Sequence, residues 1–191
     1  MSGRARILAN FALFQVGWFA CVLSGGGEID PWAGPASALL ILAVHLVMTP
    51  RGKRFEEMVA IGIITAGGCL LDVLNVSGGF LEYRGAGTDG SGIPLWVVSL
   101  WALFASMFNV ALRWLQRRPL LTAICTAIGS PLSYLAGERL DAVTIVEPRI
   151  WSAVALGASW AVFVTVALTL RGLVAAARED AGTGPTAADI E

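Results

Sequence analysis

One carboxylic acid, Asp72, lies inside a stretch of apolar residues long enough to cross a membrane. It is about fourteen residues into a predicted helix, or about 21 Å along its axis. An ionised carboxylate within the hydrocarbon costs about 2.5 to 3.5 kcal/mol on insertion scales, so we expect Asp72 to face the bundle interior and to be paired, protonated or hydrated. Asn75 follows on nearly the same helix face. Together they predict a polar stripe inside a helix bundle.

A second polar group in the stretch 120–137 offers partners for Asp72. Counted from Leu120, Tyr134 reaches about the depth of Asp72, and Ser133 precedes it. We expect a hydrogen bond from Tyr134 or Ser133 to Asp72, with Arg139 as a nearby countercharge. This pattern fits a substrate pocket or proton site open to the outer side of the membrane. It fits equally well a buried hydrogen-bond network that fixes helix packing.

Three further polar residues, Asn10, His45 and Asn109, lie nearer the opposite membrane face, and Gln15 lies between the two levels. His45 could titrate near neutral pH and act as a base, or it could be a hydrogen-bond partner between helices. Three tryptophans, Trp18, Trp101 and Trp160, lie deeper than the interfacial positions that tryptophan favours. Rings at that depth either pack between helices or line a ligand cavity.

The sequence contains no complete catalytic set. His45 is in the opposite half of the membrane from Ser130 and Ser133, and no second intramembrane acid accompanies Asp72. The cysteines lie in apolar stretches, where thiols act as small packing groups, and no metal-ligand spacing occurs. We therefore predict no catalytic residues, no metal and no cofactor, leave enzymatic activity open, and favour a role without catalysis.

The elements that position these residues are six apolar stretches. Hydrophobic residues make up 56% of the chain and charged residues 14%, against about 25% charged in soluble domains. This composition predicts an all-α polytopic membrane protein with six transmembrane helices in one domain, residues 1–176, and a disordered tail, 177–191. The glycine-rich segment 77–93 is expected to be a mobile cap outside the membrane. The helices are expected at 7–24, 33–49, 58–76, 94–115, 120–137 and 150–175.

The thirteen basic residues are unevenly divided between the two sides of such a bundle. Only Arg84, Arg139 and Arg149 fall in the odd-numbered connections, and the other ten fall in the even-numbered connections and the terminal segments. The positive-inside rule then predicts that both termini are cytoplasmic, as in a multi-pass protein of a bacterial inner membrane. The net charge of −1 and the absence of a basic patch give no reason to expect binding to nucleic acid.

Several motifs resemble those of an uncharacterised family of bacterial inner-membrane proteins, the domain-of-unknown-function family of DUF2878 type. The resemblance covers nearly all of the chain before the tail. The chain departs from the family pattern at Gly129-Ser130-Pro131, where Gly-Gly-Pro is usual, and at Leu140-Asp141, where a glycine is usual. The motifs are Asn10-Phe11, Phe14-Gln15, Gly17-Trp18-Phe19, Asp72, Pro94-Leu95-Trp96, Leu100-Trp101, Phe104-Ala105, Leu112-Arg113-Trp114-Leu115, Gly129 to Tyr134 and Ala136-Gly137.

The resemblance implies a context of lipid chemistry or lipid traffic, because family members accompany proteins of unusual fatty-acid modification. The motif positions coincide with the polar set above, so the expected ligand-binding residues are Asn10, Gln15, Asp72, Asn75, Trp101, Asn109, Ser133 and Tyr134.

Three functional hypotheses follow. The first is an accessory protein that binds a lipid or other small apolar molecule in an outward-facing pocket near Asp72 and Tyr134. The second is a small transporter or a membrane-embedded substrate-binding subunit of one. The third is a structural scaffold for membrane enzymes. Membrane lipids are the expected partners, membrane enzymes of fatty-acid modification are further candidates, and the oligomeric state stays open.

Overall fold

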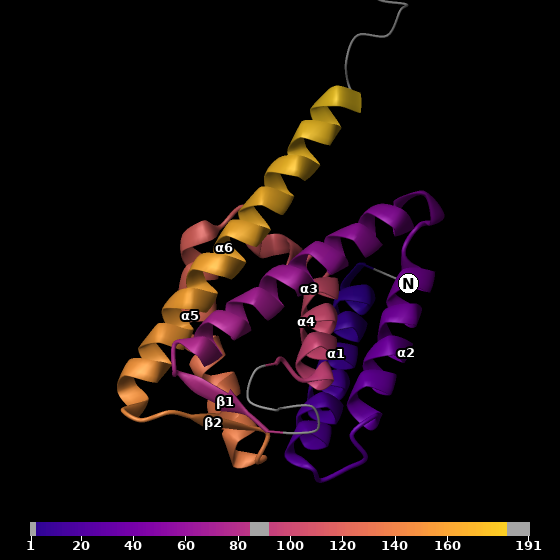
Figure 1. The fold of residues 1–191 in the computed structure, drawn as a ribbon. Coiled ribbons are helices and arrows are strands. Elements are labelled where there is room, and N and C mark those ends of the chain that lie inside the picture. Colours follow the sequence, from indigo (N-terminus) through magenta and orange to yellow (C-terminus); the bar gives the residue numbers. More distant parts are fainter. Residues whose placement is uncertain (1–2, 85–91, 183–191) are drawn as a thin grey trace, which may run out of the picture.

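The computed structural model describes residues 3–84 and 92–182 and is built from helices and one small β-ribbon (Figure 1). Two short 3-10 helices, η1 and η2, precede α3 and α5. The helices are α1 (Gly3–Gly26), α2 (Ala33–Met48), η1 (Arg51–Lys53), α3 (Arg54–Ser77), α4 (Leu95–Ser106), η2 (Arg113–Leu115), α5 (Pro119–Arg139) and α6 (Arg149–Gly182), and the strands are β1 (Leu81–Tyr83) and β2 (Val143–Ile145).

Successive helices run in opposite directions. Strand β1 follows α3 and β2 follows α5, so both helices end beside the ribbon. Helix α1 ends there too. Its Gly26 lies so close to the carbonyl oxygen of Leu140, shortly before β2, that a side chain at this position would collide with that oxygen. The N-terminus and the end of α6 lie at the other end of the molecule (Figure 1). We call the two ends the ribbon end and the terminal end. The connections that carry most of the basic residues lie at the terminal end.

Within residues 3–84 and 92–182, four helices are long and apolar enough to cross a membrane by length and composition. These are α1, α3 with the preceding turn, α5 and α6, and each has at least 21 residues. Helices α2 and α4 are also apolar, but their 16 and 12 residues are shorter. At 1.5 Å per residue they extend about 24 and 18 Å, less than the roughly 30 Å of a hydrocarbon core. The chain is thus a membrane-type helical protein, and six complete spans stay a prediction.

Helix α4 is much shorter than the expected helix 94–115, and that boundary was wrong. It ends at Ser106, and turns continue to η2. The side-chain amide of Gln116 donates a hydrogen bond to the Phe108 carbonyl oxygen over 3.0 Å, which satisfies a backbone group released by the break. The Phe108 side chain is fully buried. Irregular backbone at membrane depth is tolerated when protein encloses it in this way.

Part of the segment expected as a mobile cap is regular structure. Leu81 to Tyr83 pair antiparallel with Val143 to Ile145, and Leu81 of this ribbon is fully buried. Residues 85–91 of that segment lie outside the described residues. Helix α6 continues to Gly182, beyond the boundary expected at residue 176, and the rest of the expected tail, 183–191, also lies outside the described part of the chain.

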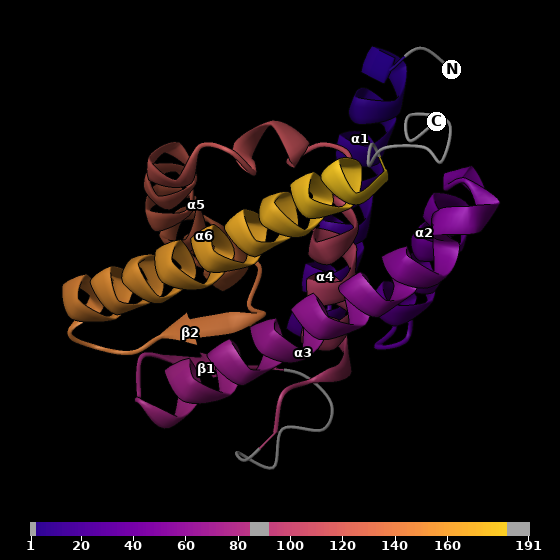
Figure 2. The ribbon, with the colours of Figure 1, turned by 90° about the horizontal axis from the view of Figure 1, so that it is seen from above.

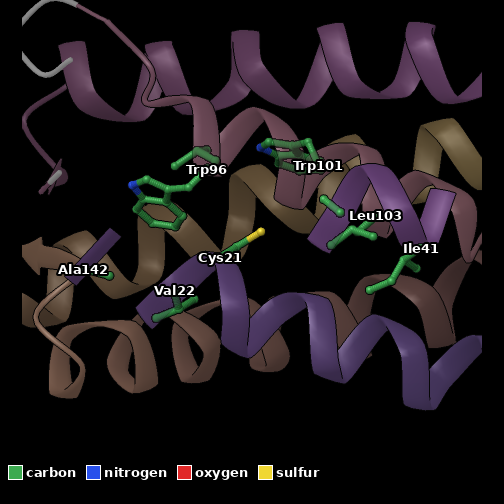
Figure 3. Close-up of a cluster of buried hydrophobic side chains, with 9 residues drawn as sticks. Cys21, Val22, Ile41, Trp96, Trp101, Leu103 and Ala142 are labelled. Carbon is green, nitrogen blue, oxygen red and sulfur yellow. The ribbon is translucent and has the colours of Figure 1, made fainter. Parts of the chain in front are cut away.

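The helices form two groups. Helix α5 packs mainly on α6, while α1, α2 and α4 pack on one another, and α3 contacts both α4 and α6 (Figure 2). The main core lies in the second group, where Cys21 and Val22 of α1 meet Ile41 of α2 and Leu103 of α4 (Figure 3). Cys21 is completely buried among these apolar side chains, in agreement with the packing role expected for it.

Candidate functional site

Asp72 is the centre of a buried polar cluster. Its side chain comes from the last third of α3, and the residue is 1% exposed. The Trp101 indole N–H of α4 donates to Oδ2 over 2.6 Å, and the Tyr134 hydroxyl of α5 donates to Oδ1 over 2.8 Å. The expected bond from Tyr134 is therefore confirmed. In the described part of the chain no bond joins Asp72 to Ser133 or to Arg139, so the expected countercharge was wrong.

The Tyr134 hydroxyl extends this cluster toward α6 and the ribbon. It accepts a hydrogen bond from the Trp160 indole N–H over 3.1 Å and lies 3.5 Å from the Tyr83 hydroxyl of β1. The rings of Trp160 and Trp101 stack with centroids 4.4 Å apart and planes 20° apart. Side chains from α3, α4, α5, α6 and β1 thus meet around one carboxylate.

Tyr83 lies outside the membrane-spanning segments and supplies the ribbon's part of the cluster. The residue as a whole is partly exposed, but its hydroxyl points into the enclosed cluster. Burial, and then the nearby Asp72 carboxylate, raise the pKa of Tyr83 well above its ordinary value. Its phenol therefore stays protonated at neutral pH and can act as a hydrogen-bond donor.

A cavity of about 600 Å³ adjoins this cluster between the two helix groups. Its walls are mostly apolar, with Asp72, Tyr83 and Tyr134 forming the main polar wall. The apolar part continues toward the terminal end as far as Leu112 and Leu168. Cavities of this size and character are typical of small-molecule sites.

The cavity opens between α1 and α5. Phe19 of α1 and Leu132 of α5 both line it and are 51% and 59% exposed. Gln15 of α1 and Ser133 of α5 line the same opening and are also exposed. The opening therefore has an apolar rim with two polar side chains, on helices long enough to cross a membrane. A molecule dissolved in the bilayer could reach the cavity between these helices.

A second polar cluster lies toward the terminal end. Glu57, in the first turn of α3, is 7% exposed. His45 Nε2 lies 3.0 Å from one of its carboxylate oxygens, and the other oxygen accepts a hydrogen bond from the Asn109 amide and lies 3.4 Å from Arg171 Nη2. His45 thus makes a hydrogen bond between α2 and α3, one of the two roles considered for it. The cluster joins α2, α3, α6 and the segment after α4.

Comparison with known proteins identifies the family. A family model described as "Protein of unknown function (DUF2878)" matches residues 7–166. The chain belongs to the DUF2878 family. No curated protein and no solved structure matches the chain. The matched range contains the Asp72 cluster, the Glu57 cluster except Arg171, and every residue that lines the cavity except Leu168.

The structure separates the residues predicted as a site in this DUF2878 protein into those that line the cavity and those that do not. Five of them, Gln15, Asp72, Trp101, Ser133 and Tyr134, line the cavity. Asn75 does not line the cavity; it is buried, and its Oδ1 accepts a hydrogen bond of 3.3 Å from the Ser159 hydroxyl. Asn109 belongs to the Glu57 cluster. Asn10 does not line the cavity and is not a member of that cluster. The two expected polar levels are therefore separate sites.

Sequence reasoning missed four members of these clusters. Tyr83 was part of an expected loop, and no sequence pattern predicted the strand that places it near Asp72. Trp160 was singled out only by its depth, and it does line the cavity, as do Trp18 and Trp101. Glu57 lies one residue before the expected helix 58–76, and Arg171 entered only the count of basic residues, so neither was linked to a cluster. The depth of the three tryptophans and the level shared by Asp72 and Tyr134 were the signals compatible with a cavity.

Proposed function

We propose that this DUF2878 protein is an accessory membrane protein that binds a lipid or another small apolar molecule in the cavity between α1 and α5. The observation that carries the proposal is the cavity of about 600 Å³, with apolar walls, one buried carboxylate and an opening rimmed by exposed apolar side chains. An amphiphile would place its chain along the apolar walls and its polar group near Asp72 and Tyr134. Burial of the chain would supply most of the binding free energy.

The distribution of basic residues supports a proposal for the orientation of the protein in the membrane. The connections rich in basic residues lie at the terminal end, so we propose that this end is cytoplasmic and that the ribbon end faces outward, as in a bacterial inner membrane. In this orientation α2 and α4 would complete the proposed six spans. A C-terminal fusion to green fluorescent protein should fluoresce in whole cells, and an alkaline phosphatase fusion at that end should be inactive. The reverse result would invert the orientation.

Gly129 allows a direct test of the cavity. It lines the opening on α5, and a Cβ atom there would meet no atom within 4 Å. The substitution Gly129→Phe should therefore fill the opening without disturbing helix packing. Ile128→Phe is the matched control, because Ile128 is 59% exposed on the same helix and does not line the cavity.

The measurement is native mass spectrometry of both variants and the wild type purified in dodecyl maltoside, with lipid analysis of the retained molecules. We expect a lipid or small molecule to be retained by the wild type and by Ile128→Phe and to be depleted in Gly129→Phe. Asp72→Asn and Tyr134→Phe should change which molecules are retained. Equal retention in Gly129→Phe and Ile128→Phe, with all variants folded, would contradict binding in this cavity and favour the scaffold hypothesis.

A second candidate function, a small transporter or a substrate-binding subunit of one, draws support from the break in α4. Transporter sites are commonly formed by discontinuous helices. Helix α4 ends at Ser106, between the Trp101 of the Asp72 cluster and the Asn109 of the Glu57 cluster. Transport would require a coupled ion or ATPase. An ATPase that copurifies with the wild-type protein would favour this candidate. Substitutions in the connections at the terminal end should then abolish the copurification.

A further inference from the structure

We infer that the ligand of the cavity is a cationic amphiphile, with an ammonium or quaternary-amine head group held at Asp72 and an apolar chain that extends toward Leu112 and Leu168. This inference rests on the proposed function and specifies the chemical class of its ligand. Three features of the cavity carry it: the one acidic side chain among its described lining residues, its aromatic walls, and the direction in which its apolar part extends.

The first feature is a buried carboxyl group without a cationic side chain beside it. Among the described residues that line the cavity, Asp72 is the only carboxylate, and none is lysine, arginine or histidine. Its hydrogen-bonding partners Trp101, Tyr134 and Tyr83 are neutral. They occupy three of about four acceptor sites that a carboxylate offers, so capacity for one further contact remains for a ligand. A cationic head group would supply the charge that the protein does not.

Nearby arginines do not supply this charge either. At the ribbon end Arg84 pairs with Asp141 over 3.0 Å, and Arg149 pairs with Glu138 over 3.0 Å and with Glu147 over 3.2 Å. At the terminal end Arg171 belongs to Glu57. The described ion pairs therefore satisfy other acids and leave Asp72 facing the cavity without a cation.

The second feature is the aromatic surface around Asp72. Trp101 stacks on Trp160, and Trp160 meets Tyr134 edge to face with centroids 6.3 Å apart. Tyr83 meets Trp96 in the same way at 5.5 Å. All five rings line the cavity. A cation within about 6 Å of an aromatic ring is attracted by the ring quadrupole, and aromatic cages with a nearby carboxylate recognise quaternary ammonium groups.

The third feature is the shape of the apolar part. From Trp160, beside the carboxylate, to Leu168 the wall follows α6 for eight residues, or about 12 Å. Val164 and Leu168 are each 1% exposed, so this part of the cavity ends in the buried core. A hydrocarbon chain fits this wall, whereas a small cation without a chain would leave it empty.

The test compares four probes with the wild-type protein in dodecyl maltoside, using the intrinsic tryptophan fluorescence of the site rings. Dodecyltrimethylammonium carries both proposed parts, dodecanol carries the chain with a neutral head, laurate carries the chain with an anionic head, and tetramethylammonium carries only the head. We expect dodecyltrimethylammonium to bind about tenfold or more tightly than dodecanol, and laurate to bind more weakly than dodecanol. Tetramethylammonium should compete at least about tenfold more weakly than the chain-bearing cation.

Asp72→Asn keeps the size of the side chain and removes its charge. We expect this variant to bind dodecyltrimethylammonium and dodecanol within about threefold of each other, as the charge-dependent preference is lost. A wild-type protein that binds dodecanol or laurate as tightly as the cation would overturn the inference, and this comparison does not depend on the variant folding. Equal competition by tetramethylammonium would overturn the assignment of a chain-bearing ligand.

Gly129→Phe separates this inference from the proposed function. If the chain-bearing probes bind the wild type and Ile128→Phe but not Gly129→Phe, without preference for the cation, the cavity binds amphiphiles and only the head-group inference is wrong. If all three proteins respond alike to every probe, the cavity does not bind amphiphiles and both proposals are wrong.

Discussion

Gly68 of α3 packs against the Trp101 ring of the Asp72 cluster, and this packing yields a quantitative prediction. A Cβ atom at Gly68 would overlap the Cδ2 and Cε3 atoms of the Trp101 indole. Trp101 is 3% exposed and stacks on Trp160, so its ring has little space to move. We expect Gly68→Ala to displace this ring and to weaken its hydrogen bond to Asp72.

The size of the effect follows from three contributions. Overpacking costs about 1–3 kcal/mol. Weakening a hydrogen bond to a charged group costs up to about 1.5–3 kcal/mol. Alanine regains up to about 1 kcal/mol through its helix propensity. We therefore expect Gly68→Ala to lower the free energy of unfolding by about 2–4 kcal/mol.

Gly62→Ala on the same helix is the control, because a Cβ atom at Gly62 meets no atom within 4 Å. It should leave the free energy of unfolding unchanged or raise it by up to about 1 kcal/mol. The assay is unfolding in dodecyl maltoside with increasing sodium dodecyl sulfate, followed by far-UV circular dichroism and tryptophan emission. If the two variants unfold within about 0.5 kcal/mol of each other, the tight contact between α3 and Trp101 is refuted.

Three more substitutions test the two clusters with the same unfolding assay. Glu57→Gln removes the carboxylate that pairs with His45 and the partly exposed Arg171, so it should lower the free energy of unfolding by about 1–3 kcal/mol. Because the pair is buried, this loss should persist in about 1 M salt, which screens ion pairs at the surface. Trp160→Phe keeps an aromatic ring of smaller size and removes the N–H that donates to Tyr134, so it should cost at least about 0.5–1.5 kcal/mol from the hydrogen bond alone. Burial and the Asp72 carboxylate raise the pKa of Tyr83, whereas the unfolded phenol ionises near its ordinary value of about 10. The unfolded state therefore loses this proton first, so wild-type stability should fall as pH rises above about 10 and fall less steeply in Tyr83→Phe; parallel slopes would contradict the buried phenol.

The Asp72 cluster was largely predictable because depth along a helix can be counted. The 1.5 Å rise per residue brought Asp72 and Tyr134 to one level from sequence alone, and their hydroxyl and carboxylate are 2.8 Å apart. Charge distribution likewise indicated which connections share an end. The ribbon was not predictable, since three-residue strands carry too little alternation to be distinguished from a loop.

The early end of α4 and the buried Glu57 cluster escaped prediction for the same physical reason. The stretch 94–115 contains neither glycine nor proline after its first residue, so local propensity favours a continuous helix. Its break depends on distant partners: the Gln116 amide satisfies the Phe108 carbonyl, and the Asn109 amide reaches Glu57 on α3. A helix continued from Ser106 to Leu115 would carry the chain about 13 Å farther along its axis, away from the turn that now holds Asn109. Burial of Glu57 and the break in α4 therefore require each other, because the acid loses a donor if the helix continues and the irregular segment loses an anchor if the acid is absent.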